Sequence, residues 1–152
     1  MTNVKFNVHD MMIFQQQKDF IDTAIVPLVH LDFSVPNLLQ SSAAANYLFA
    51  LTNYIEQQFK GRVVLLPPVC YTTLLRSKEL IQNVHSELEN AGFKHVFYMT
   101  SDVCWRNLGE GHSIIWMPAI PLESMDENIR SSILEEQFKQ IVPQMITEWS
   151  HV

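Results

Sequence analysis

The sequence predicts a three-layer α/β domain of the Rossmann-like kind, with about four mostly parallel strands and helices on both faces of the sheet. Short apolar runs alternate with longer segments of helical periodicity. The short runs are continuously apolar, which is typical of strands covered on both faces. Two helix–glycine–strand junctions, at Gly61 and Gly92, lie about 30 residues apart, the length of a repeated βα unit.

The first helix is expected over residues 10–22, where apolar side chains recur at helical spacing and Asp10 can cap the amino end. Residues 24–33 (AIVPLVHLDF) are short and apolar, so we expect the first strand there. Pro27 lacks a backbone N–H and predicts an edge position or a bulge for this strand.

A helix is predicted over residues 37–59, begun by a capping box of Asn37 and Gln40. Gly61 suits the left-handed position after its end. The second strand is RVVLL, residues 62–66, which a double proline stops.

The second half of the chain continues the alternation. We expect a helix over residues 73–90, a third strand over 93–99 and one or two helical turns within 101–108. Gly92 ends the longer helix. The fourth strand, over 112–117, follows a connection at the lower length limit for a parallel crossover, so its direction stays open.

The last helix is expected over residues 125–150, with Ser124 and Glu127 as a capping box. Pro143 should kink this helix or split it in two.

A length of 152 residues suits one domain, which we expect to span residues 1–152. The 16 acids and 10 bases give a net charge of −6, which argues against a nucleic-acid binder. Most of the excess acid falls in residues 122–152, and the acidic last helix is a candidate interface.

Charged residues make up 17% of the chain, against about 25% in ordinary domains. Residues 33–55 contain no charge, but they hold too many polar side chains for a membrane span, and we expect none. Buried strands explain part of the low charge. The neutral outer face of the 37–59 helix remains, and there we expect a protein partner or a second copy of the chain.

Two cysteines, Cys70 and Cys104, are too few for a disulfide framework and lack zinc spacing. We expect both to be buried structural residues, with a thiol nucleophile as the alternative. The amino-terminal residues lack the apolar core of a signal peptide, so we expect a cytoplasmic location. No cofactor and no metal site is predicted.

Open α/β sheets bind ligands beyond the carboxyl ends of their strands. Asp32 follows the first strand and lies two residues from His30, so both side chains share one face of a regular strand. Tyr71 and Thr73 follow the second strand, where hydroxyls at a helix start can receive an anion. Capping is the structural alternative for the threonine.

The segment after the third strand, TSDVCWRN, is the richest in polar groups. Ser101 and Asp102 can hold a ligand hydroxyl or cap the next helical turn. Trp105 and Arg106 can clamp an anion, or they can be a half-buried ring beside a surface arginine.

The runs DFIDTAIVPL (19–28) and QQFKGRVVLLPPVCY (57–71) resemble the YpiF-like proteins, a small uncharacterised family of Firmicutes. The resemblance covers most of the chain and implies a cytoplasmic bacterial protein with a domain of unknown function. It carries no reaction and no catalytic residue to this sequence.

No phosphate-binding glycine loop, nucleophile elbow or metal motif is present, so the sequence favours a non-catalytic binding or protein-interaction module. The alternative is a protein or enzyme that binds a small anion or nucleotide-like molecule at the strand ends, which leaves enzymatic activity open.

Overall fold

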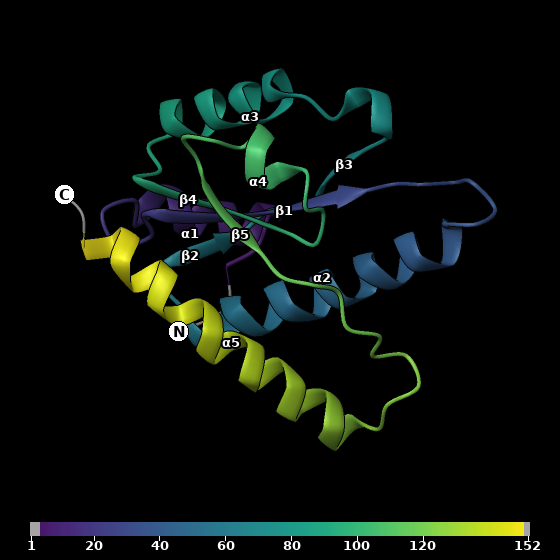
Figure 1. The fold of residues 1–152 in the computed structure, drawn as a ribbon. Coiled ribbons are helices and arrows are strands. Elements are labelled where there is room, and N and C mark those ends of the chain that lie inside the picture. Colours follow the sequence, from purple (N-terminus) through teal and green to yellow (C-terminus); the bar gives the residue numbers. More distant parts are fainter. Residues whose placement is uncertain (1–3, 151–152) are drawn as a thin grey trace.

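The computed structural model describes residues 4–150 and has at its centre a parallel sheet of five strands (Figure 1). The strand order is β2-β1-β4-β5, and β3 also pairs with β1, on the side that β2 occupies. The strands are β1 (Thr23–His30), β2 (Val63–Leu65), β3 (Val69–Tyr71), β4 (His95–Thr100) and β5 (Ser113–Trp116).

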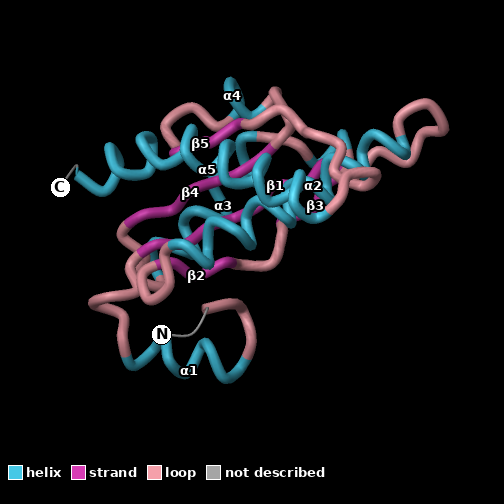
Figure 2. The backbone as a smooth tube through the Cα atoms, turned by 90° about the horizontal axis from the view of Figure 1, so that it is seen from below, coloured by secondary structure: helices cyan, strands magenta, loops and turns pink. Residues whose placement is uncertain are grey.

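Helices cover both faces of the sheet, as the sequence predicts. On one face lie α2 (Leu38–Gln58) and α5 (Glu127–Ser150). On the other lie α1 (Val8–Gln16), α3 (Lys78–Asn90) and α4 (Trp105–Leu108), and Figure 2 shows the same arrangement from below. The class is therefore a three-layer α/β fold with a parallel sheet, and β5 is parallel to β4.

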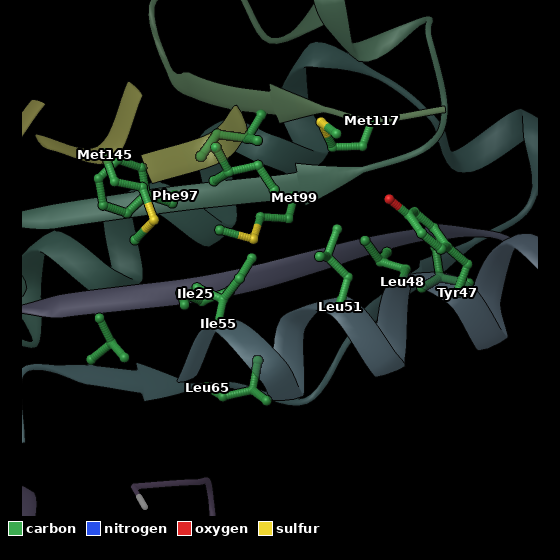
Figure 3. Close-up of a cluster of buried hydrophobic side chains, with 14 of the residues drawn as sticks. Ile25, Tyr47, Leu48, Leu51, Ile55, Leu65, Phe97, Met99, Met117 and Met145 are labelled. Atoms are coloured by element: carbon green, nitrogen blue, oxygen red, sulfur yellow. The ribbon is translucent and has the colours of Figure 1, made fainter. Parts of the chain in front are cut away.

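The two faces of the sheet have separate cores. Ile25 and Met99 on the sheet pack with Leu51 and Ile55 of α2 in the first core, which also receives Met145 of α5 (Figure 3). The second core packs Phe14, Ile81 and Trp105, from α1, α3 and α4, against the opposite face of the strands. The continuous apolar runs in the sequence follow from this double burial.

The position of β1 corrects the expectation from Pro27. The strand is central, with β4 on one side and β2 and β3 on the other, and not at an edge. Leu66 N donates to the Ile25 carbonyl, so the backbone polar groups of Ile25 point toward the strand that contains β2 and β3. Because every second residue of a strand points to the same side, the backbone nitrogen of Pro27 faces that strand too. There the edge strand is interrupted between β2 and β3, so the missing N–H of Pro27 has no ladder partner to lose.

The edge strand was predicted only in part. The double proline at Pro67 and Pro68 stops β2, but the chain then returns to pair as β3, with Leu28 opposite Val69 and His30 opposite Tyr71. Because prolines cannot donate to a ladder, an edge strand tolerates them as a break between two short paired segments.

Helix ends differ from the predictions in their capping groups. Asn7, not Asp10, caps α1, with its Oδ1 accepting from Asp10 N at 2.8 Å. Asn37 precedes α2 but makes no side-chain cap, so the predicted box with Gln40 is wrong. At the start of α5, where a capping box of Ser124 and Glu127 was predicted, it is Asp126 Oδ1 that accepts from Ile129 N.

Two predicted helices differ in extent from the observed ones. The helix expected over residues 10–22 is α1, which ends at Gln16. The 73–90 helix is divided into a 3-10 turn at Thr73–Leu75 and α3, which begins after the capping Ser77. The last helix contains Pro143 and is not split. The two glycine predictions are confirmed, since φ is 86° at Gly61 and 101° at Gly92. Among residues 4–150, no helix combines the length and apolarity needed to cross a bilayer.

Candidate functional site

A cavity of about 330 Å³ opens at the carboxyl edge of the sheet, between the ends of β1 and β4. After β1 the chain turns to α2 on one face, and after β4 it turns to α4 on the other face. The two connections diverge, which is the switch point where open α/β sheets bind ligands. The cavity is lined by Leu28, Val29, His30, Asp32, Asn37, Gln40, Ser41, Ala44, Ala45, Leu48, Ser101, Asp102 and Val103.

Asp102 is the best-connected side chain of the site. Its Oδ2 accepts from the Tyr71 hydroxyl at 2.7 Å and from Arg76 Nη1 at 2.8 Å, and its Oδ1 accepts from Cys104 N at 3.1 Å. Burial raises the pKa of Asp102, but the hydrogen bonds from Arg76 and Tyr71 outweigh it, and the net effect lowers the pKa. This carboxylate therefore stays ionised, and its oxygens already accept hydrogen bonds from three groups of the protein.

Tyr71 and Trp105 form a buried hydrogen-bonded chain behind Asp102. Both side chains are buried, and Trp105 Nε1 donates to the Tyr71 hydroxyl, with the two rings edge to face at 5.3 Å. Burial is the main reason that the pKa of Tyr71 is raised, so the phenol remains neutral. Neither residue lines the cavity.

His30 lies between the cavity and the edge strand. Its Nε2 is 2.9 Å from Thr73 Oγ1, and its ring stacks on Tyr71 at 5.6 Å. An imidazole within reach of a hydroxyl is the nearest that the site comes to a catalytic pair. In residues 4–150, no carboxylate hydrogen-bonds to this ring to orient it.

Asp32 organises the turn into α2. Its Oδ1 accepts from Ser34 N at 3.0 Å and Ser34 Oγ at 2.7 Å, and its own N–H donates to Ser41 Oγ at 3.0 Å. The side-chain hydrogen bond from Ser34 is the largest cause of the lowered pKa of Asp32. The half-buried carboxylate is therefore a fixed negative charge at the cavity.

Ser101 is the polar group of the lining that remains unsatisfied. Its Oγ is buried and has no hydrogen-bond partner among the described residues, while its carbonyl accepts from Trp116 Nε1 at 3.1 Å. Arg106 lies elsewhere, with its guanidinium 5.3 Å from the Trp116 ring centre and beside a different cavity.

The structure thus brings three of the seven sequence candidates, Asp32, Ser101 and Asp102, into one lining. Tyr71 does not line the cavity but donates a hydrogen bond to Asp102, and Thr73 hydrogen-bonds to His30, which does line it. Trp105 and Arg106 lie outside the lining. In the described part of the chain, no three His, Cys, Asp or Glu side chains group closely enough to hold a metal ion.

Sequence reasoning missed Arg76, Gln40 and Ser41. Arg76 is the first charged residue after Arg62 and follows a strand end, which could have signalled a partner for Asp102. The expectation for the cysteines is wrong for Cys70, which is exposed, while Cys104 is half-buried and both are free thiols.

Comparison with known proteins places the chain in a family. The sequence profile of the family described as "Protein of unknown function (DUF2487)" matches residues 12–149. The "Uncharacterized protein YpiF" of Bacillus subtilis (strain 168) is 31% identical over 150 residues, covering 97% of this chain and 99% of that protein. No solved structure matches. The profile match and the identity over nearly the full length show that this chain belongs to the YpiF-like DUF2487 family.

Proposed function

We propose that the protein is a non-catalytic binding protein whose ligand, a small uncharged or cationic molecule, occupies the cavity between α2 and residues 101–103. Ser101 carries this proposal, because the residue lines the cavity and its hydroxyl, closed off from solvent, has no hydrogen-bond partner among residues 4–150. A buried polar group left unpaired costs about 1–3 kcal/mol. A ligand group in the cavity would recover that cost.

The size and lining of the cavity suit a small molecule. Its volume of about 330 Å³ lies near the lower end of ligand sites, which span roughly 300–1,000 Å³. Ala44, Ala45 and Leu48 give α2 an apolar wall, and Ser101 and Asn37 add polar groups. Such a mixture binds molecules that have both an apolar part and a few hydrogen-bonding groups.

The charge of the lining supports a ligand with donors better than an anion. Among residues 4–150, no lysine or arginine lines the cavity, while Asp32 is ionised and Asp102 is neutralised by Arg76. The amino end of α2 contributes about half a positive charge, which is less than the full negative charge of Asp32. A hydroxyl or ammonium group therefore suits this cavity more than a phosphate does.

Binding without catalysis follows from the state of the polar groups. The carboxylate of Asp102 already has three donors, and that of Asp32 holds its own turn. His30 is stacked on Tyr71 with Thr73 as its hydrogen-bond partner, and a catalytic base would need a third group to orient it. The free thiols of Cys70 and Cys104 support a reducing, cytoplasmic location.

Equilibrium dialysis of the purified chain against a bacterial small-molecule extract, read by mass spectrometry, tests the proposal. Ala44→Phe fills the cavity, and Ser42→Phe is the matched control on an exposed position of the same helix. We expect at least one neutral or cationic compound to concentrate on the wild type and on Ser42→Phe but not on Ala44→Phe.

Two results would count against the proposal in different ways. If no compound concentrates on the wild type, or if Ala44→Phe retains the same compounds, the cavity is not the site. If the compounds lost in Ala44→Phe are anions, the site stands and the charge class is overturned.

A further inference from the structure

Large apolar side chains lie exposed along the connection from β1 to α2. Phe33, Val35, Leu38 and Leu39 belong to this connection and to the first turn of α2, with Val35 93% and Leu39 81% exposed. Figure 1 shows the connection projecting beyond the end of the sheet. Its four side chains do not pack into either core.

Two further segments bring exposed apolar groups to the same edge. Leu74, 96% exposed, and Leu75 lie in the 3-10 turn after β3, and Val103 follows β4. Because β3, β1 and β4 are neighbouring parallel strands, their carboxyl ends share one edge of the sheet. We call the seven exposed apolar residues at this edge the apolar rim: Phe33, Val35, Leu38, Leu39, Leu74, Leu75 and Val103. Val103 also lines the cavity, so the rim borders its mouth.

The exposed area of the rim is that of a protein interface. At roughly 150 Å² for a fully exposed side chain, the lower end of the aromatic range because six of the seven are Leu or Val, exposed fractions of 44–96% amount to on the order of 700 Å². A stable interface buries about 800 Å² per partner. Single exposed apolar residues need no explanation, but several at one edge mark an interaction site.

The charge at this edge favours a second copy of the same chain. Residues 31–40, 72–77 and 100–104 contain Asp32, Arg76 and Asp102 as their charged residues, and the last two are paired at 2.8 Å. Within these segments the one base, Arg76, is paired, and the nearest exposed bases, Lys78 and Arg106, lie just outside them and are too few for a polybasic membrane site.

We propose that the apolar rim is a self-association surface, on which a second copy of this chain docks with its own carboxyl edge and covers the mouth of the cavity. A two-fold interface places the same patch on both partners, so an apolar and nearly neutral surface is complementary to itself. The proposal stands on the rim and does not depend on what the cavity binds.

Sedimentation velocity of the full chain between about 1 and 200 µM tests the rim. Leu39→Glu and Leu74→Glu add a charge to exposed positions that no core needs, and Val8→Glu in α1 is a control with the same 81% exposure as Leu39. We expect the wild type and Val8→Glu to form dimers. The dissociation constant should rise at least ten-fold in each rim variant.

Three results would overturn the proposal. The first is a wild type that stays monomeric over the whole range, and the second is a dimer that both rim substitutions leave intact. The third is a monomer that co-sediments with phosphatidylcholine vesicles and loses this binding in Leu39→Glu, because a lipid surface would then be the occupant.

Discussion

Asp102 joins three parts of the chain at the scale of single residues. It follows β4, accepts from Tyr71 at the end of β3, and pairs with Arg76 just before α3. The Arg76 and Asp102 side chains are 18% and 10% exposed, so the pair is largely shielded from water. Removing one charge would leave the other buried without a partner, which is the costly case for an ion pair.

Asp102→Asn should lower the free energy of unfolding by about 2–4 kcal/mol in urea denaturation at pH 7. Because the folded state lowers the pKa of Asp102, its contribution is present above the unfolded value of 3.8 and is lost as pH falls through the folded pKa. The difference between wild type and variant should therefore shrink in acid. Asp19→Asn, at an exposed position, should change the stability little, and an equal loss there would show a general charge effect.

Glu56 in α2 is a buried acid, with no exposed surface and no hydrogen-bond partner for either oxygen among residues 4–150. Burial is the main cause of its raised pKa, which Asp10 raises further and the ammonium groups of Lys5 and Lys60 oppose. The contribution of Glu56 to stability should thus be fully present below the unfolded pKa of 4.5 and be lost as pH rises through the folded pKa.

Glu56→Gln removes that titration while nearly preserving the shape. Its melting temperature should exceed that of the wild type by an amount that grows from pH 5 to pH 8, measured by circular dichroism. Glu87→Gln changes the net charge equally at an exposed position and should show no such growth. A constant difference over this range would mean that Glu56 is already ionised in the fold.

At the scale of elements, caps decide where the helices begin. Ser77 Oγ accepts from Leu80 N at 3.3 Å and starts α3 after the 3-10 turn. Ser77→Ala should cost about 1 kcal/mol of stability. Ser86→Ala, on the exposed side of the same helix, should be neutral or slightly stabilising. Equal effects of the two changes on chemical denaturation would argue against the cap.

The sequence predicted the type and order of most elements because periodicity and burial agree there. α2 shows this, since Leu48, Leu51 and Ile55, expected on its inward face, are buried, and Phe59, expected on the same face, is half-buried against the first core. The misses fall at prolines and caps. Pro27 is tolerated in a central strand because of a break in the neighbouring strand, and that break is a tertiary feature invisible along the chain.

The site was harder to predict than the fold. Strand ends identified Asp32, Ser101 and Asp102, because parallel strands end at one edge. The pairing of Asp102 with Arg76 depends on where the turn before α3 places the guanidinium, and no local pattern reports that. The apolar rim could not be predicted either, because the sequence does not show whether an apolar residue in a loop is exposed or buried.

At the scale of the whole molecule, the two cores share one sheet, so each stabilises the strands that the other needs. We therefore expect the chain to unfold as one domain, with coincident near- and far-ultraviolet circular dichroism transitions in urea. Two separate transitions would show that the two faces unfold independently.

The most direct test of the central claim, that the β1–β4 cavity is a ligand site, is an amide ¹H–¹⁵N titration of the full chain with n-butylamine and, separately, with butyrate. We expect saturable shift changes with butylamine at the cavity lining, around Asp32, Ser41 and Ser101, and weaker ones with butyrate. Ala44→Phe should abolish them while Ser42→Phe retains them. Shift changes that are absent, scattered over the surface or unchanged in Ala44→Phe would contradict the claim.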